Sequence, residues 1–290
     1  MSTLIPVRAV LFALLASLMF ATMGVAVRFS SGYLPNEMIV FLRNSFGLCF
    51  LLPWIYRKGF RDFATHRLIA HIIRSVSGLT AMYCFFYAIA NLHLAEAVLL
   101  NYSAPLFIAI IALFWLGERP SKKLIYAIVV GFIGICFILK PGAGMFQGVA
   151  LIGLFSGIFA AFAMVTIRNL STTEPTLRIV FYFSLTSTLI SAVPLFWAWQ
   201  TPALLAVLAM AVAGLAATLG QIMLTYSYSL APAAQVGPYT YSSVVFAACY
   251  GWIFWQETPD TFTFIGALLV IMAGSMTLQR RTLPKLAEPD

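Results

Sequence analysis

The stretch Asn91–Pro120, NLHLAEAVLLNYSAPLFIAIIALFWLGERP, occurs twice in this chain. A shift of 139 residues carries it without a gap onto Leu230–Pro259, LAPAAQVGPYTYSSVVFAACYGWIFWQETP. Each copy is a long apolar segment with polar residues and a proline in its middle, and each ends on an acidic residue followed two positions later by proline. The chain is therefore built from two related halves. The shift pairs Ala95 with Ala234, Tyr102 with Tyr241, Ser103 with Ser242, Glu118 with Glu257 and Pro120 with Pro259.

The composition places the chain in a membrane. Of its 290 residues, 62% are hydrophobic and 9% are charged, whereas soluble domains carry roughly 25% charged residues. The stretch Ile179–Gln256 contains no Asp, Glu, Lys or Arg, and it is long enough for three spans of about 20–25 residues each. The net charge of +8 comes mostly from residues between apolar segments, where basic residues set the orientation of a membrane protein.

Apolar segments separated by polar or turn-forming residues predict an all-α membrane protein with ten transmembrane helices, five in each half. The clearest break is the turn-rich stretch KPGAGMFQG at residues 140–148. We expect a first five-helix repeat at 1–144, a second at 145–282 and a cytoplasmic tail at 283–290. The predicted spans are residues 9–27, 35–56, 68–90, 92–116, 123–139, 149–167, 177–199, 203–230, 232–255 and 262–278.

The basic residues between the spans predict the orientation of the chain, because cytoplasmic loops are rich in Lys and Arg. With both termini in the cytoplasm, the opposite side keeps only Arg28 and Lys140. Five spans per repeat is an odd number, so the second repeat must enter the membrane from the other face. Inverted repeats of this kind are typical of secondary transporters. The cytoplasmic side then holds Arg8, Arg57, Lys58, Arg61, Arg67, Arg119, Lys122, Lys123, Arg168, Arg280, Arg281 and Lys285.

The repeats resemble a known family of carriers. In each repeat the fourth segment ends in an acid-x-proline stop, GERP at Gly117–Pro120 and QETP at Gln256–Pro259, and a glycine-containing fifth segment follows. With the ten-span count, this pattern is similar to the EamA family of the drug/metabolite transporter superfamily, over nearly the whole chain. The resemblance implies a plasma-membrane carrier of small metabolites, often amino acids or related compounds; in a bacterium this membrane is the inner membrane.

Two arginines in the spans are candidate binding residues, because charged groups inside a bilayer tend to face the protein interior and mark pathways. Arg43 lies about 12 Å into the second span, at ~1.5 Å per residue. Its guanidinium either clamps a carboxylate or phosphate of the substrate or tethers helices through an ion pair or hydrogen bonds. Arg74 shares a helix face with His71 and Gly78. Arg74 either lines the substrate path or reaches the cytoplasmic interface, and His71 is either an interfacial or satisfied histidine or a proton relay.

Glu96 is a carboxylate inside the fourth predicted span. A buried carboxylate binds a proton more readily than an exposed one, so Glu96 is the candidate for proton coupling. The alternative is a partner for an arginine or an outward-facing acid, since Glu96 lies only about 6 Å from the start of the span. Its counterpart in the second half is Gln235, which cannot titrate, so coupling through this position would belong to the first half alone.

Polar residues stand mid-bilayer in the fourth and ninth spans, about 15 Å from the span starts. A proline lies beside each group, Pro105 in the fourth span and Pro238 in the ninth, and proline distorts a helix by removing an N–H donor. We expect a polar pocket where these segments converge at half depth; the alternative is aromatic packing with satisfied hydroxyls. The expected lining residues are Asn101, Tyr102, Tyr239, Thr240 and Tyr241, with Gln221 and Tyr226 as further candidates.

The acid-proline stops Glu118/Pro120 and Glu257/Pro259 are predicted to be structural. Proline suits the first turn of the next helix, and an acid is favoured at the positive end of that helix dipole. The GxxxG at residues 153–157 predicts a close helix contact. The sequence contains no nucleotide-binding motif and no cluster of His, Cys, Asp or Glu with metal-ligand spacing, so we expect no cofactor and no metal.

Together these features favour a secondary active transporter, and not an enzyme, that moves an amino acid or organic acid by alternating access. Arg43 favours substrates with an anionic group, and the energy would come from a proton gradient or from exchange. The expected partners are the small-molecule substrate and the lipid bilayer, without nucleic acid; a homodimer is compatible with the sequence. The alternatives are a membrane enzyme acting on a lipid-linked phosphate through Arg43, Arg74 and His71, and a flippase or scaffold with a polar groove open to lipid.

Overall fold

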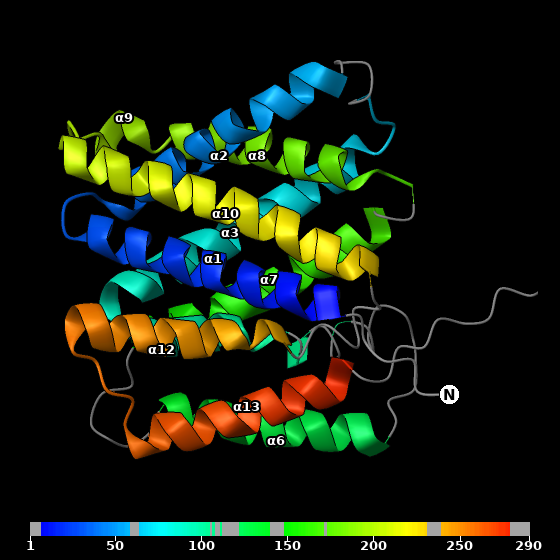
Figure 1. Cartoon of the computed structure of the whole chain (residues 1–290), viewed down its shortest axis with the longest axis vertical. Helices are drawn as coiled ribbons and strands as arrows, with labels where there is room; N and C mark the ends of the chain where they lie inside the picture. The colour runs from blue at the N-terminus through cyan, green and yellow to red at the C-terminus, as the bar shows by residue number, and fades with distance from the viewer. Residues whose placement is uncertain are drawn as a thin grey trace, which may run out of the picture.

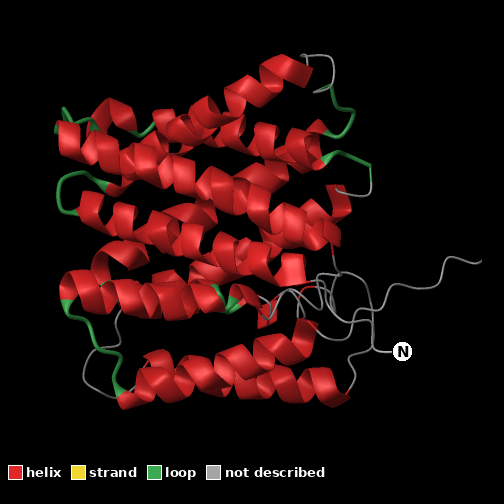
Figure 2. Cartoon of the chain, viewed as in Figure 1, coloured by secondary structure: helices red, strands yellow, loops and turns green. Residues whose placement is uncertain are grey.

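The protein is helical throughout the part of the chain that the structure describes, apart from its turns and loops (Figure 2). This computed structural model describes residues 7–58, 64–104, 106–107, 111, 122–139, 148–170, 173–230 and 239–278. The helices are α1 (Val7–Ser31), α2 (Asn36–Lys58), α3 (Leu68–Asn91), α4 (Leu94–Asn101), α6 (Lys122–Leu139), α7 (Gly148–Leu170), α8 (Thr176–Ala192), α9 (Leu195–Ala198), α10 (Leu204–Leu230), α12 (Ser242–Trp255) and α13 (Thr261–Leu278).

Each of the ten predicted spans corresponds to one of these helices, except the seventh, which corresponds to two, and the chain is an all-α membrane protein with ten membrane-spanning segments. Within the described residues four helices are long and apolar enough by themselves to cross a bilayer: α1, α3 and most of α7 and α10. The seventh span is divided into α8 and α9 beside Pro194, whose ring removes an N–H donor from the helix.

The two repeats are inserted in opposite directions. Arg28, in the last turn of α1, donates to carbonyl oxygens at the end of α3, whereas Arg67, just before α3, donates to Asn169 in the last turn of α7. The ends of α1 and α7 therefore lie at opposite ends of α3, so these equivalent first helices run antiparallel. In Figure 1 the first turn of α1 and the last turn of α13 lie at the same side of the bundle, as an even number of spans requires.

Helix packing repeats the same two-fold relation. α1 packs along α10 just as its equivalent α7 packs along α3, the equivalent of α10. In three further contacts a helix packs against its equivalent in the other repeat: α2 with α8, α4 with α12, and α6 with α13. Figure 1 shows α6 and α13 as a pair at one edge of the bundle. The contacts between repeats therefore form the core, and neither repeat is a separate domain in packing terms.

The fourth and ninth spans, predicted at 92–116 and 232–255, are each interrupted near their middle. α4 ends at Asn101, and Tyr102 and Ser103 form a turn; α12 begins only at Ser242, after a turn at Tyr241. The two breaks fall on residues that the 139-residue shift pairs. They occur where the neighbouring prolines predicted a distortion, and Pro105 and Pro238 themselves lie outside the described residues.

The predicted close contact of the GxxxG at residues 153–157 is confirmed. A Cβ atom on Gly157 would lie 2.6 Å from Ser103 Oγ and 2.8 Å from the carbonyl oxygen of Leu100. A side chain at this position would thus collide with the backbone of α4. Glycine lets α7 approach α4 closely enough for polar groups on the two helices to meet.

Candidate functional site

A cavity of about 290 Å³ lies between α2, α3, α8 and α10. It is toward the end of the bundle where α3 and α8 begin, because Leu177 at the start of α8 and Tyr226 near the end of α10 both line it. We call it the arginine cavity, since two guanidinium groups line it, each in the hydrophobic interior. Its lining residues are Arg43, Gly47, Leu51, Arg74, Leu177, Val180, Phe183, Ser184, Ala217, Thr218, Gln221, Ile222 and Tyr226.

Arg43 enters the cavity from α2 and is buried, with 7% of its surface exposed. Its Nη1 donates to Oδ1 of the neighbouring Asn44 at 2.9 Å, and Asn44 is held in turn by a contact from its Nδ2 to Sδ of Met82. Its Nε has no hydrogen-bond partner among the described residues. The side chain is therefore fixed at one nitrogen and keeps an unused donor at Nε.

Arg74 enters from α3 and is also buried. Its guanidinium carbon lies 3.8 Å from the centroid of the Phe183 ring on α8, a cation–π distance. The guanidinium lies over Gly78 one turn further along α3, where a Cβ atom would collide with Nη1. Both Nε and Nη1 lack hydrogen-bond partners within the described part of the chain. The arginine that might have reached the cytoplasmic interface instead points into the cavity.

The two guanidinium groups give the cavity an uncompensated positive charge. They are near enough to repel each other, and no carboxylate of the described residues forms an ion pair with either. Burying a charge without a partner is costly, and two like charges side by side add to that cost. An anion with two oxygens would fill the unused donors and remove the repulsion.

The rest of the lining combines polar and apolar groups. Ser184, Thr218 and Gln221 supply polar atoms, while Phe183 and Tyr226 supply aromatic surface. Gln221 and Tyr226 were expected in the same pocket as the mid-bilayer tyrosines, but they lie in the arginine cavity. The lining within the described residues contains no acid and no imidazole, so these groups suit binding better than acid-base chemistry.

The mid-bilayer residues form a separate, packed group that we call the tyrosine cluster: Asn101, Tyr102, Tyr241 and Ser243. Tyr102 Oη and Ser243 Oγ are 2.9 Å apart, and the rings of Tyr102 and Tyr241 lie 6.0 Å apart. Asn101 Nδ2 donates to Ser156 Oγ of α7 at 3.1 Å. None of these residues lines the arginine cavity.

The described side chains of the fourth and ninth spans thus pack against one another, and a pocket walled by these two spans remains a prediction from the sequence. The hydroxyl of Tyr241 is buried without a hydrogen-bond partner among the described residues, and the backbone carbonyl of Thr240 accepts from Ser17 at 3.3 Å. Tyr239 lies partly exposed beside them. The cluster resembles the alternative that the sequence analysis gave to a polar pocket, which was aromatic packing, because the rings of Tyr102 and Tyr241 from the two repeats lie against each other.

Glu257 and Glu96 lie at the opposite end of the bundle, where α1 ends and α4 begins. Glu257 forms an ion pair with Arg28, and its Oε2 accepts from the backbone N–H of Leu94 at 2.9 Å. The acid was expected at the start of the next helix, α13, but it caps α4 of the other repeat. Asp260 caps α13 instead, accepting from the N–H of Thr263 at 2.9 Å, and Pro259 precedes that helix.

Glu96 is in the first turn of α4 and accepts a hydrogen bond from Thr263 Oγ1 at 2.9 Å. His93 Nδ1 lies 3.8 Å from the same carboxylate oxygen. The described contacts thus tie Glu96 to α13 and place it away from the arginine cavity, which it does not line. Glu118 and Pro120, the other acid-proline stop, lie outside the described residues.

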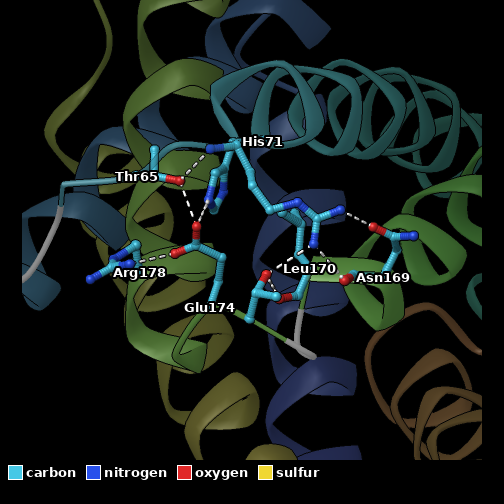
Figure 3. A network of polar contacts seen from close by, with 8 residues as sticks. Thr65, His71, Asn169, Leu170, Glu174 and Arg178 are labelled. Carbon is cyan, nitrogen blue, oxygen red and sulfur yellow. Dashed lines mark hydrogen bonds and ion pairs between the residues drawn. The ribbon is translucent and has the colours of Figure 1, made fainter.

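A second polar network joins the repeats where α3 and α8 begin (Figure 3). Glu174, in the loop before α8, accepts from Thr65 Oγ1 at 2.6 Å and from Arg178 Nη1 at 2.5 Å. Burial acts to raise the pKa of the Glu174 carboxyl, but the hydrogen bonds from Thr65 and Arg178 outweigh it and hold the pKa below its usual range. Glu174 is therefore ionised at neutral pH. Arg67 completes the network by binding Asn169 and Thr173 across the same junction.

Within the described residues, no group of three or more His, Cys, Asp or Glu side chains is placed to hold a metal ion. The positively charged arginine cavity is itself unsuited to a cation.

Comparison with known proteins now identifies the family. A family model described as the EamA-like transporter family matches residues 7–140 and 147–278. The chain belongs to this family. The resemblance found in the repeated acid-proline segments is thereby confirmed, and an EamA-like protein is a multi-pass membrane protein of a transporter family.

Individual relatives agree with this assignment. The chain is 36% identical to the pseudopaline exporter of Pseudomonas aeruginosa strain UCBPP-PA14, over 91% of this chain and 93% of the exporter. It is 28% identical to an S-adenosylmethionine uptake transporter of Rickettsia bellii, over 81% of each chain. A solved crystal structure with 18% identity matches with a TM-score of 0.65, over 92% of this chain and 95% of the other, and shows the fold alone.

The sequence analysis did not identify several residues of the candidate site. Phe183, Ser184 and Thr218 are ordinary members of apolar spans, and their role depends on which helices meet. For the Glu174 network a local signal did exist, because Glu174 and Arg178 have the i, i+4 spacing of a helical ion pair. The spacing of Arg74 and Gly78 was noted, and the structure explains it as room for the guanidinium.

Proposed function

We propose that this protein is a secondary active transporter that carries a small, carboxylate-bearing metabolite, with the carboxylate held between Arg43 and Arg74. The observation that carries the proposal is the pair of buried guanidinium groups with unused donors in one cavity. A planar carboxylate accepts paired hydrogen bonds from a guanidinium, so one such group can satisfy donors of both arginines. Amino acids and organic acids of modest size fit a cavity of about 290 Å³.

The inverted repeats support alternating access as the mechanism. The arginine cavity lies between helices of both repeats, α2 and α3 from the first and α8 and α10 from the second, so a rocking motion of one repeat against the other would change its exposure. The distribution of basic residues supports cytoplasmic termini, and with that orientation the cavity lies nearer the cytoplasmic end. The relatives include both an exporter and an uptake transporter, so transport must be tested in both directions.

The alternative of an enzyme or flippase acting on a lipid-linked phosphate has less support. The arginines would bind a phosphate as well as a carboxylate, but the described lining offers no general base for a reaction. A flippase would also need a route for the lipid tail from the cavity to the bilayer. Export and uptake relatives favour the movement of a small molecule.

The test is transport by the purified protein in proteoliposomes, in both directions, with and without a proton gradient. Matched pairs of labelled compounds isolate the effect of the carboxylate: L-leucine with L-leucinamide, malate with malamide, and a phosphate monoester as a further anion. We expect the pair member with a carboxylate to be transported and the amide without one to be transported at a much lower rate. Equal transport of both members of each pair would contradict the proposal.

A further inference from the structure

His71 is a buried histidine with unused hydrogen-bonding capacity. Only 1% of its surface is exposed, and neither Nδ1 nor Nε2 has a hydrogen-bond partner among the described residues. Buried side-chain nitrogens are normally hydrogen-bonded, so this position needs an explanation. The sequence analysis left three roles open for His71: a histidine at the membrane interface, a histidine with all its hydrogen bonds made, or a proton relay. The first two roles do not fit these contacts.

The surroundings of His71 connect the two polar sites at this end of the bundle. On one side, its Nε2 lies 4.0 Å from Oε1 of Glu174, the ionised carboxylate that joins the repeats (Figure 3). On the other side, Arg74 follows one helical turn along α3 on the same face. The ring of His71 stacks on that of Tyr182 with centroids 4.5 Å apart, and Tyr182 neighbours Phe183, the ring that covers Arg74.

The charges that face His71 determine when it can hold a proton. Arg67 just before α3, Arg74 on α3 and Arg178 on α8 oppose a positive charge on the imidazole, and Glu174 in the loop before α8 favours it. Tyr182 is the remaining titratable group in contact with it. The charge of Glu174 is already shared with Arg178. The balance around an empty arginine cavity is therefore positive.

An anion in the arginine cavity changes that balance. A carboxylate bound to Arg43 and Arg74 would cancel positive charge one helical turn from His71, so a proton on His71 would meet less repulsion. The protonated ring has a ready acceptor, because Glu174 Oε1 is within reach of a small side-chain movement. By thermodynamic reciprocity, an anion that favours protonation must itself bind better to the protonated protein.

We propose that His71 takes up a proton when an anionic substrate binds to Arg43 and Arg74, so that proton and anion bind cooperatively. The proton comes from solution and is bound on a ring nitrogen, and no bond to the substrate forms or breaks. This inference rests on the proposed function, because it needs an anion in the arginine cavity. It replaces Glu96 with His71 as the proton-binding residue, since His71 is beside the cavity and Glu96 is at the other end of the bundle.

The experiment is calorimetric titration of the full-length protein in detergent with the best-transported carboxylate of the panel, in buffers of different ionisation enthalpy, over pH 5–8. Those buffers report how many protons are taken up on binding. For the wild type we expect net proton uptake and an affinity that falls by up to about tenfold per pH unit as His71 loses its proton. His71→Gln should bind the anion without proton uptake and with a flat pH profile.

The controls are His66→Gln and His93→Gln, since both side chains are exposed and outside the cavity. Glu96→Gln tests the earlier candidate in the same assay. Proton uptake that persists in His71→Gln, or no proton uptake by the wild type, would overturn the inference while leaving anion binding intact. If the wild type binds no carboxylate at any pH, the proposed function itself is wrong.

Discussion

Two buried polar sites in this protein differ in how they use their polar groups. In the tyrosine cluster, Tyr102 and Ser243 satisfy each other and the rings of the two repeats pack together. In the arginine cavity, Arg43 and Arg74 keep unused donors beside about 290 Å³ of space. The first arrangement holds the fold together, whereas the second leaves donors that the proposed anion would fill.

The difference follows from the repeat symmetry. Tyr102 and Tyr241 are paired by the duplication, and each meets its own counterpart where the repeats join, so the same side chain fills both sides of the contact. Arg43 has no such counterpart. In the front part of the two halves a shift of 140 residues pairs Pro35 with Pro175 and Phe41 with Phe181, and it carries Arg43 to Phe183, which packs on Arg74. The tyrosine cluster is thus formed by residues that are the same in both repeats, whereas the arginine cavity is formed where the repeats differ.

The largest expected effect is on anion binding in the arginine cavity. Arg43→Gln and Arg74→Gln each remove charged donors worth about 1.5–3 kcal/mol per hydrogen bond, so anion affinity should fall roughly 100-fold. Removing one of two like charges relieves repulsion, so thermal stability without substrate should stay the same or rise. Equilibrium binding and thermal unfolding measure both effects. Arg57→Gln, at an exposed arginine near the end of α2, is the control. Equal anion affinities in all three variants would show that the anion does not bind in the arginine cavity.

A smaller effect is expected from Gly78→Ala, which changes the arginine cavity without removing a charge. The new Cβ atom would collide with Nη1 of Arg74 and lie 3.0 Å from Cε2 of Phe183, so the guanidinium must move from its position over the ring. We expect anion affinity to fall roughly tenfold, about 1.4 kcal/mol. Gly148→Ala is the matched control, because nothing lies within 4 Å of its added Cβ. Binding that is the same in both variants would show that the position of Arg74 is unimportant.

The smallest effects are expected in the tyrosine cluster. Tyr102→Phe loses the contact with Ser243 and should destabilise the protein by about 0.5–1.5 kcal/mol, while anion affinity stays within roughly twofold. Tyr241→Phe removes a hydroxyl that has no partner among the described residues, so its stability should be unchanged or higher. Unfolding in detergent and equilibrium binding separate the two properties. A loss of anion affinity in Tyr102→Phe as large as that in Arg43→Gln would show that the tyrosine cluster also takes part in binding.

Most of the fold follows from the sequence because its signals are local. Uncharged runs of span length, the repeated segment with Tyr102 and Tyr241, and the basic loops predict ten spans in two inverted repeats, and the family confirms that architecture. The breaks in the fourth and ninth spans were expected as distortions near prolines. Their position could not be predicted, because hydrogen bonds such as that between Asn101 and Ser156 depend on neighbouring helices.

The site was harder to predict because it depends on which helices meet. The depth of Arg43 marked it as a candidate, but its partner could not be chosen between Arg74 and the mid-bilayer tyrosines without the packing of α2 on α8 and α10. Glu257 shows the same limit. Its position before α13 suggested a cap for that helix, yet the fold brings it to the N-terminus of α4, where the N–H of Leu94 is the donor.

Thiol accessibility tests the central claim most directly. Thr218→Cys in the arginine cavity and Ser243→Cys in the tyrosine cluster would each be made in a variant whose native cysteines are replaced by serine. We predict that a hydrophilic thiol reagent labels Thr218→Cys, that the transported carboxylate protects it, and that Ser243→Cys stays unlabelled. Labelling and protection of Ser243→Cys with an unreactive Thr218→Cys would contradict the account, because the substrate would then bind among the tyrosines.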